Sequence, residues 1–295
     1  MKKIVLLLSV CGMLCCCKPQ EWDEVVRVSY PLNEAYSELI VNNAFRVETF
    51  VPSESQPYGA IVEAGEKAQS LVRVEVRNGK LYIDLRSGNF GSTKRPIVYL
   101  PIEDIENLNV MELNGASLFA ARTGTMSLKK IVLTGASVYS GDGVIYATND
   151  NDELEGEVSL NLSGASEFSG IIYAPSVKMN LSGASVYKGT IHAPSVDAEL
   201  SGASQCHLRK VSPDFSGDIE MNMRLSGASK MESGAFATTH VRGELSGASS
   251  AKVNCCDELS VNLTGASVLR YSVLSDACQL DFDCHWSEGS RVIAE

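Results

Sequence analysis

The chain has 295 residues, of which 44% are hydrophobic and 21% are charged, and its formal net charge is −11. This composition is that of a folded body and excludes a wholly disordered chain. The acidic balance argues against nucleic acid as a partner, because proteins that bind nucleic acid carry basic stripes.

Residues 1–16 have the pattern of a lipoprotein signal peptide: a basic start, an apolar stretch too short to span a bilayer, and then a run of cysteines. This pattern resembles bacterial lipoprotein signals, in which a leucine three residues before the cysteine precedes cleavage and lipid attachment. Leu14 stands three residues before Cys17. We therefore predict a lipid on Cys17, with Cys11 and Cys16 as alternatives. The acyl chains would anchor the protein in the cell envelope, at the outer membrane, facing the periplasm or the cell surface.

The segment 17–38 contains no repeat, and we predict that it forms a lipid-anchored tether. Between residues 39 and 112, hydrophobic and polar residues alternate, as in "VRVEVRNGKLYIDL" at 72–85. Alternation with a period of two is typical of β-strands with one buried face.

A five-residue motif recurs eight times within residues 113–290. It consists of leucine, a small polar residue, glycine, alanine and serine, and the next position is free. A worn ninth copy, "SEGS", stands at 287–290. Successive motif glycines are 18 to 29 residues apart, and they are Gly115, Gly135, Gly164, Gly183, Gly202, Gly227, Gly247 and Gly265.

The motif favours a strand followed by a sharp corner. Its glycine indicates a backbone shape or a close approach that a Cβ would prevent, and its alanine suggests a tight interior corner. Repeats of about 20 residues that are mostly strand are typical of a β-solenoid. We therefore predict an all-β fold, a single-stranded, right-handed parallel β-helix over residues 39–295 with coils of about 19–20 residues. A sandwich of antiparallel hairpins is the alternative.

Within this interpretation, residues 39–112 form less regular opening coils, because a terminal coil lacks a neighbour on one side. A separate N-terminal β-domain is the alternative. The two longest intervals between glycines contain the polar segments 148–157 and 209–218, which we predict to be loops inserted at one edge of the coils.

The motif also predicts two columns of hydroxyl groups. We expect the residue before glycine, as in Ser182 and Ser201, to face solvent, where a column of small polar groups could suit a glycan. We expect the serine after alanine, as in Ser185 and Ser204, to satisfy backbone groups at the corner.

Five cysteines follow the predicted anchor, and no two of them form a C-x-x-C pair, so zinc is poorly supported. Cys255 and Cys278 lie 23 residues apart, which is close to one coil. The simpler interpretation is that these cysteines are small buried residues without a disulfide. Equivalent positions of stacked coils lie within disulfide range, so Cys255 and Cys278 are the candidate pair for a disulfide.

The sequence contains no recognisable catalytic motif. The four histidines are isolated, and no G-x-S-x-G surrounds a serine. The acidic residues between 150 and 155 do not follow the order of a calcium loop, so a solvated loop is the simpler interpretation. We predict no catalytic residues, no metal and no cofactor.

The strand-rich start at 39–47, the paired strands at 72–85 and the serial "LSGAS" motif resemble the auto-transporter adhesin head family, the GIN domain. The resemblance extends over about residues 39–290. The usual family motif ends in glycine, whereas here it ends in serine. The resemblance implies a parallel β-helix in an exported bacterial protein, with an adhesive role and no catalytic motif.

We therefore expect a lipid-anchored, extracytoplasmic, non-enzymatic module that binds a glycan or a surface protein. Two alternatives stay open: a carbohydrate-active enzyme, such as a polysaccharide lyase or hydrolase on a β-helix, and a purely structural component of the envelope. Clustered acids and bases on one face would favour the enzyme.

Overall fold

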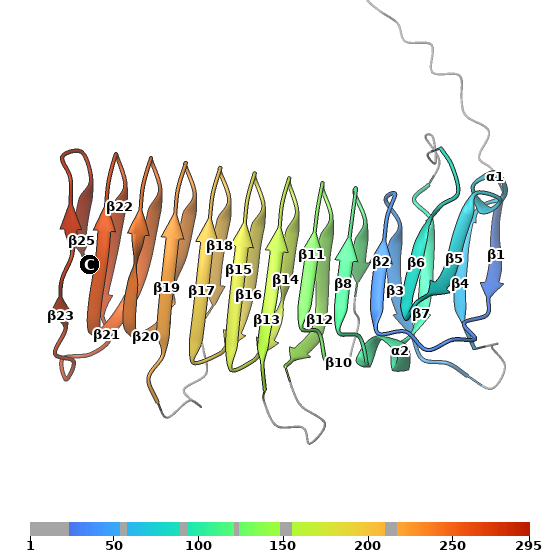
Figure 1. Ribbon diagram of the computed structural model, residues 1–295, viewed down its shortest axis with the longest axis horizontal. Coiled ribbons are helices and arrows are strands. Elements are labelled where there is room, and N and C mark those ends of the chain that lie inside the picture. Colours follow the sequence, from blue (N-terminus) through green and yellow to red (C-terminus); the bar gives the residue numbers. More distant parts are fainter. Residues whose placement is uncertain (1–23, 54–57, 89–93, 121–123, 148–154, 210–216) are drawn as a thin grey trace, which may run out of the picture.

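The computed structural model describes residues 24–53, 58–88, 94–120, 124–147, 155–209 and 217–295. Cys17 and the predicted signal peptide lie outside these residues. The protein is all-β, with 60% strand and 4% helix, as predicted. Its described strands belong to one sheet and lie side by side along the axis of an elongated body (Figure 1).

The N-terminal third combines seven strands with two short helices. Their bounds are β1 (Val25–Tyr30), β2 (Glu38–Val41), β3 (Arg46–Phe50), β4 (Ala60–Gly65), α1 (Glu66–Gln69), β5 (Val72–Arg77), β6 (Lys80–Leu85), β7 (Ile97–Pro101) and α2 (Ile102–Glu106).

The repeat region contains the remaining described strands. Their bounds are β8 (Val110–Leu113), β9 (Leu118–Ala120), β10 (Thr125–Met126), β11 (Lys130–Leu133), β12 (Val138–Tyr146), β13 (Glu157–Leu162), β14 (Glu167–Tyr173), β15 (Ser176–Leu181), β16 (Val186–His192), β17 (Ser195–Leu200), β18 (Gln205–Arg209), β19 (Glu220–Leu225), β20 (Lys230–Leu245), β21 (Ser250–Leu263), β22 (Val268–Val273), β23 (Asp281–Phe282), β24 (His285–Trp286) and β25 (Arg291–Ala294).

Every strand pairing within the repeat region is parallel, and equivalent residues of successive copies lie next to each other. Leu162 pairs with Leu181, and Leu181 pairs with Leu200. The motif leucines from Leu162 to Leu263 are at most 2% exposed. Alternate residues of a strand point to the same side, so the motif leucines all lie in one interior column.

Each motif joins two columns of strands. Pre-corner strands such as β15 and β17 end at the motif leucine, whereas post-corner strands such as β16 and β18 begin after the motif serine. β20 and β21 each start as a post-corner strand and end as a pre-corner strand. Both columns bury one side in the same hydrophobic cluster, so their outer sides form two separate surfaces, here called the pre-corner face and the post-corner face.

Stacked aromatic rings fill part of this interior. Phe119, Tyr139, Phe168 and Tyr187 occupy one register position on successive post-corner strands. Their ring centroids are 5.6, 4.7 and 5.4 Å apart, and all four side chains are fully buried. Large rings at one register position therefore pack into a continuous column.

The corner requires glycine for two reasons. All eight motif glycines have φ between +70° and +80°, which is a left-handed conformation. In addition, a Cβ on Gly183 would lie 2.6 Å from the carbonyl oxygen of Gly164, and a Cβ on Gly202 would lie 2.7 Å from that of Gly183. Successive coils therefore touch through glycine backbones.

The structure corrects two details of the predicted corner. The motif alanine does not lie inside, since Ala184 and Ala203 are exposed at the tip of the turn. In the ninth copy, Trp286 pairs with Leu263, so Gly289 takes the place of the alanine and not that of the glycine. The buried Ser290 still donates to the carbonyl oxygen of Leu263, at 3.4 Å.

The N-terminal third makes the sheet mixed, so an entirely parallel β-helix is not confirmed. β1 with β4, β4 with β7, and β5 with β6 are antiparallel pairs. The order is not sequential either, because β2 lies between β6 and β8. β1 falls inside the predicted tether 17–38, so the sheet begins earlier than residue 39.

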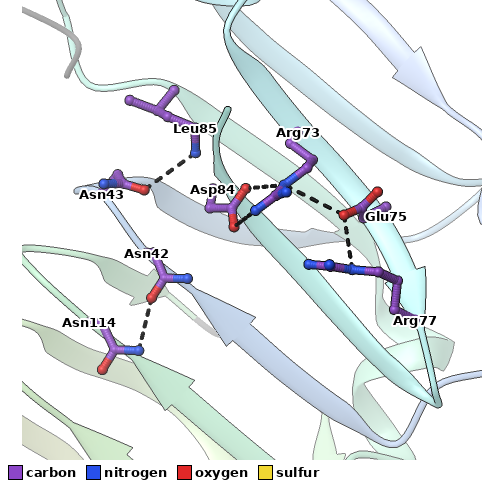
Figure 2. A network of polar contacts seen from close by, with 8 residues as sticks. All are labelled: Asn42, Asn43, Arg73, Glu75, Arg77, Asp84, Leu85 and Asn114. Atoms are coloured by element: carbon purple, nitrogen blue, oxygen red, sulfur yellow. Dashed lines mark hydrogen bonds and ion pairs between the residues drawn. The ribbon is translucent and has the colours of Figure 1, made fainter. Parts of the chain in front are cut away.

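A further corner copy precedes the repeat, and the sequence analysis missed it. Val41 pairs with Leu113, which places Asn43 at the position of Gly115. Asn43 has φ +62°, and asparagine is one of the few residues that tolerate this region. Figure 2 shows the amide of Asn114 donating to Asn42 of this copy, at 2.9 Å.

An Arg–Asp pair lies beside this corner. Arg73 on β5 holds Asp84 on β6 with two hydrogen bonds of 2.6 and 2.5 Å, and Glu75 lies between Arg73 and Arg77 (Figure 2). The next residue, Leu85, donates its N–H to the side chain of Asn43, at 3.3 Å. These contacts link the antiparallel hairpin to the first corner.

Replacing Gly183 by alanine tests the corner. We expect Gly183→Ala to lower the free energy of unfolding by more than the 1–3 kcal/mol or so that a left-handed non-glycine residue costs, because the Cβ also meets the Gly164 carbonyl. Gly217→Ala is the control, since Gly217 has open space around it and no positive φ. Urea unfolding midpoints measure the stability of both variants. Equal midpoints would refute this account of the corner.

Candidate functional site

Two adjoining hollows lie on the pre-corner face, over strands β15, β17, β19, β20 and β21. Their volumes are about 620 and 570 Å³. We call them together the polar groove. Side chains of four residues line both hollows, and these are Glu199, Arg224, Glu244 and Asn262.

The strand register arranges the groove in rows. One row contains Asn180, Glu199, Arg224, Glu244 and Asn262, one residue from each coil. The neighbouring row contains Lys178, Asp197, Asn222, Arg242 and Ser260. Because paired strands lie about 4.8 Å apart, hydrogen-bonding groups recur at that spacing along the body.

Opposite charges in the groove pair with each other. Arg224 donates to Glu199 at 3.1 Å, and Asn222 donates to Asp197 at 2.9 Å. Beside them, Arg242 donates to Glu258 at 2.9 Å, and this bond lowers the pKa of the Glu258 carboxyl and raises the pKa of Arg242. Exposed pairs of this kind contribute little stability, so a ligand can replace them at small cost.

Hydroxyl groups line the corner edge of the groove, and the predicted exposure to solvent holds for Ser201 but only in part for Ser182. Ser201 is exposed, whereas Ser182 is half-buried and donates to the carbonyl oxygen of Leu162 at 3.4 Å. The second column has the predicted structural role. Ser185 and Ser204 are fully buried, and each donates to a motif leucine carbonyl of the preceding coil at 3.3 Å.

The predicted disulfide has the wrong first partner. Cys256, not Cys255, is bonded to Cys278, with a Cα–Cα distance of 5.0 Å. Neighbouring residues of a strand point to opposite sides, so Cys255 points into the core while Cys256 points outward. Cys255 is a buried free thiol that donates to backbone oxygens.

The described residues give no support to metal chemistry or to membrane-spanning helices. No group of three or more His, Cys, Asp or Glu side chains in this part of the chain could hold a metal ion. The histidines have separate surroundings: His192 stacks on Tyr173, for example, whereas His207 lies on the post-corner face. Most of the acidic segment 150–155 and of the insertion 209–218 falls outside the described residues. The described helices have four and five residues, and neither could cross a bilayer.

The family model "Putative auto-transporter adhesin, head GIN domain" matches residues 35–273. The chain belongs to this family. No curated protein matches the chain.

Solved structures share the fold at low sequence identity. A protein from Parabacteroides distasonis, described as a putative lipid binding protein, has a TM-score of 0.54 and 11% identity, covering 94% of this chain and 98% of the other. A putative adhesin from Parabacteroides merdae has a TM-score of 0.51 and 13% identity, covering 94% and 97%. A putative adhesin from Parabacteroides distasonis has a TM-score of 0.50 and 15% identity, covering 92% and 96%.

The two hydroxyl columns should respond differently to mutation. Ser204→Ala removes a buried hydroxyl bonded to Leu181, and we expect it to reduce the free energy of unfolding by about 1 kcal/mol. Ser201→Ala removes an exposed hydroxyl and should change it by less than about 0.5 kcal/mol. Thermal or urea unfolding compares them, and a larger loss for Ser201→Ala would reverse the assigned roles.

Proposed function

We propose that this GIN-domain chain is a non-enzymatic, adhesin-like binding module of the cell envelope, and that its repeat region winds as a right-handed parallel β-helix. The parallel register of equivalent residues in successive coils supports the β-helix. The adhesin-like family supports a role outside the cytoplasm. A β-helix of this kind would act as a stiff rod that presents its faces to a partner.

The ligand that fits the polar groove is an extended, uncharged glycan. The observation that carries this proposal is the repetition of hydrogen-bonding side chains, one from each coil, along the two rows of the groove. A polymer with hydroxyls on every unit could satisfy several coils at once. Because the strands already hold these groups in place, binding would order little of the protein.

Binding fits the arrangement of charges in the groove better than hydrolysis does. A glycosidase needs two carboxyl groups that face the same glycosidic bond, one of them as a proton donor. Of the carboxylates that line the two hollows, Glu199 is engaged by Arg224 and Asp197 by Asn222. Only Glu244 has no such partner among the described residues, so the groove offers no free pair of carboxylates. These pairs suit a surface that exchanges internal hydrogen bonds for bonds to a ligand.

A lipid on Cys17 would fix the module to the outer membrane. The N-terminal residues carry this proposal, since two lysines and an apolar stretch precede Leu14 and the cysteines. Mass spectrometry of the protein from membrane fractions should find an acylated N-terminal Cys17. A mature protein that begins elsewhere, or that retains Met1, would refute the anchor.

A glycan array tests the binding function on the full chain, followed by calorimetry with a soluble oligosaccharide that the array identifies. Arg224→Gln and Asn222→Ala should each weaken binding about tenfold, as the loss of one or two hydrogen bonds predicts. Lys130→Gln is the control, because Lys130 is an exposed residue of the same face outside the groove. Release of new reducing ends or unsaturated products would instead favour the enzyme, and equal affinities for all variants would exclude the groove.

A further inference from the structure

The two faces of the body differ in charge, although the whole chain is acidic. On the same coils, the pre-corner face carries mainly acidic residues: Glu157, Asp197, Glu199, Glu220, Glu244, Glu258 and Asp281 against Lys178, Arg224 and Arg242. The post-corner face carries mainly basic residues: Lys188, Arg209, Lys230, Lys252, Arg270 and Arg291 against Glu167, Glu232 and Glu295.

The strand register places several of these cations in line. Lys188 pairs with His207, His207 with Glu232, Glu232 with Lys252, and Lys252 with Arg270. Arg209 lies two residues after His207 on the same outer side of β18. We call Lys188, His207, Arg209, Lys252 and Arg270 together the basic patch.

A hollow of about 650 Å³ opens within this patch. Its lining residues include Lys188, His207, Arg209 and Lys252, and Glu232 is the acidic residue among them. The hollow exists because Gly234 and Ala235 stand where larger side chains would fill the space. A Cβ on Gly234 would lie 2.8 Å from the Lys252 stem, so glycine lets this lysine lie across β20.

The His207 imidazole is partly buried and lies near one carboxylate and three cations. Partial burial lowers the pKa of the His207 imidazole, and Glu232 opposes that effect. Lys230, Lys188 and Arg209 lower the pKa further, because three nearby cations disfavour a fourth positive charge. An anion in the hollow would relieve the same repulsion.

The present partners of these cations are easily exchanged. Lys188 contacts Glu167 at 3.0 Å, with side-chain exposures of 45% and 40%. Lys252 contacts Glu295 near the end of the chain, and both side chains are at least one-third exposed. Ion pairs this exposed contribute about 0–1 kcal/mol each, so carboxylates of a ligand can replace those of the protein.

We propose that the basic patch is a second binding site, independent of the polar groove, for a linear carboxylated polysaccharide that runs along the axis of the body. Its carboxylates would meet Lys188 on one side of Glu232, and Lys252 and Arg270 on the other side. One sugar ring would sit in the hollow between them, beside His207 and Arg209. The excess of cations supports an anionic partner, and cations of one row on both sides of Glu232 support a polymer with repeated charges. The hollow favours a sugar ring over a membrane, since a membrane needs a flat or protruding contact surface.

The test uses the full chain with oligogalacturonate as the carboxylated probe. Binding measured by calorimetry should weaken with added salt, because screening acts on exposed charges. The double variant Lys188→Gln/Lys252→Gln should bind about fivefold more weakly. Its matched control is Lys129→Gln/Lys130→Gln, which removes the same charge from exposed lysines outside the patch and should bind like the unmodified protein.

A variant with higher affinity complements the double lysine variant, because a misfolded protein would not bind oligogalacturonate more tightly. Glu232→Gln removes the carboxylate that lies in line with the patch, and it should tighten oligogalacturonate binding about twofold or more. Asn222→Ala in the polar groove should leave this binding unchanged, which separates the two sites even if the proposed function of the groove fails.

Three results would overturn the proposal. Equal weakening by the two double variants would mean that only the net charge matters. Binding to phosphatidylglycerol vesicles but not to oligogalacturonate, lost in the Lys188→Gln/Lys252→Gln variant, would assign the patch to a lipid surface. An absence of oligogalacturonate binding at low salt would remove the site altogether.

Discussion

The contact between glycine backbones at the corner is the constraint on which the rest of the repeat region depends. Each coil turns through a left-handed glycine whose carbonyl oxygen accepts the N–H of the alanine one coil on, as Gly164 does from Ala184 at 2.7 Å. The coils can approach this closely because no Cβ intervenes. The buried serine then bonds the leucine carbonyl of the preceding coil, so the same few residues fix both the turn and the stacking.

The repeat made the register of the region after residue 113 predictable, because a parallel solenoid stacks the motif leucines that recur once in each coil. The predicted roles of Ser185 and Ser204 followed from that register. The disulfide was wrong by one residue for a related reason. A separation of about one coil identified the stacked pair, but only the side to which each residue points distinguishes Cys255 from Cys256, and the sequence analysis did not apply the period of two there.

The repeat motif does not extend into the N-terminal third, so it could not predict which strands pair there. The corner at Asn43 uses asparagine in place of glycine, and a phenylalanine stands where the buried serine usually lies. Between this corner and the next copy, β4 pairs with β7 and β5 pairs with β6 in antiparallel fashion, and β2 lies next to β8 across 72 residues of sequence. Alternation alone predicts strands, but it carries no information on which strands become neighbours.

The same register explains why both proposed sites are long surfaces and not compact clefts. The corner and the core fix the motif and every inward residue, so the outward positions alone are free to vary, and each coil adds one side chain to each outward row. Individual contacts at such positions are exposed and therefore weak. A polymer that binds several coils at once gains from linking them, since each further contact forms at a high effective concentration. In the proposed function, the polar rows of one face and the basic patch of the other would turn a structural repeat into repeated recognition, and their different charges would let one body hold two kinds of chain.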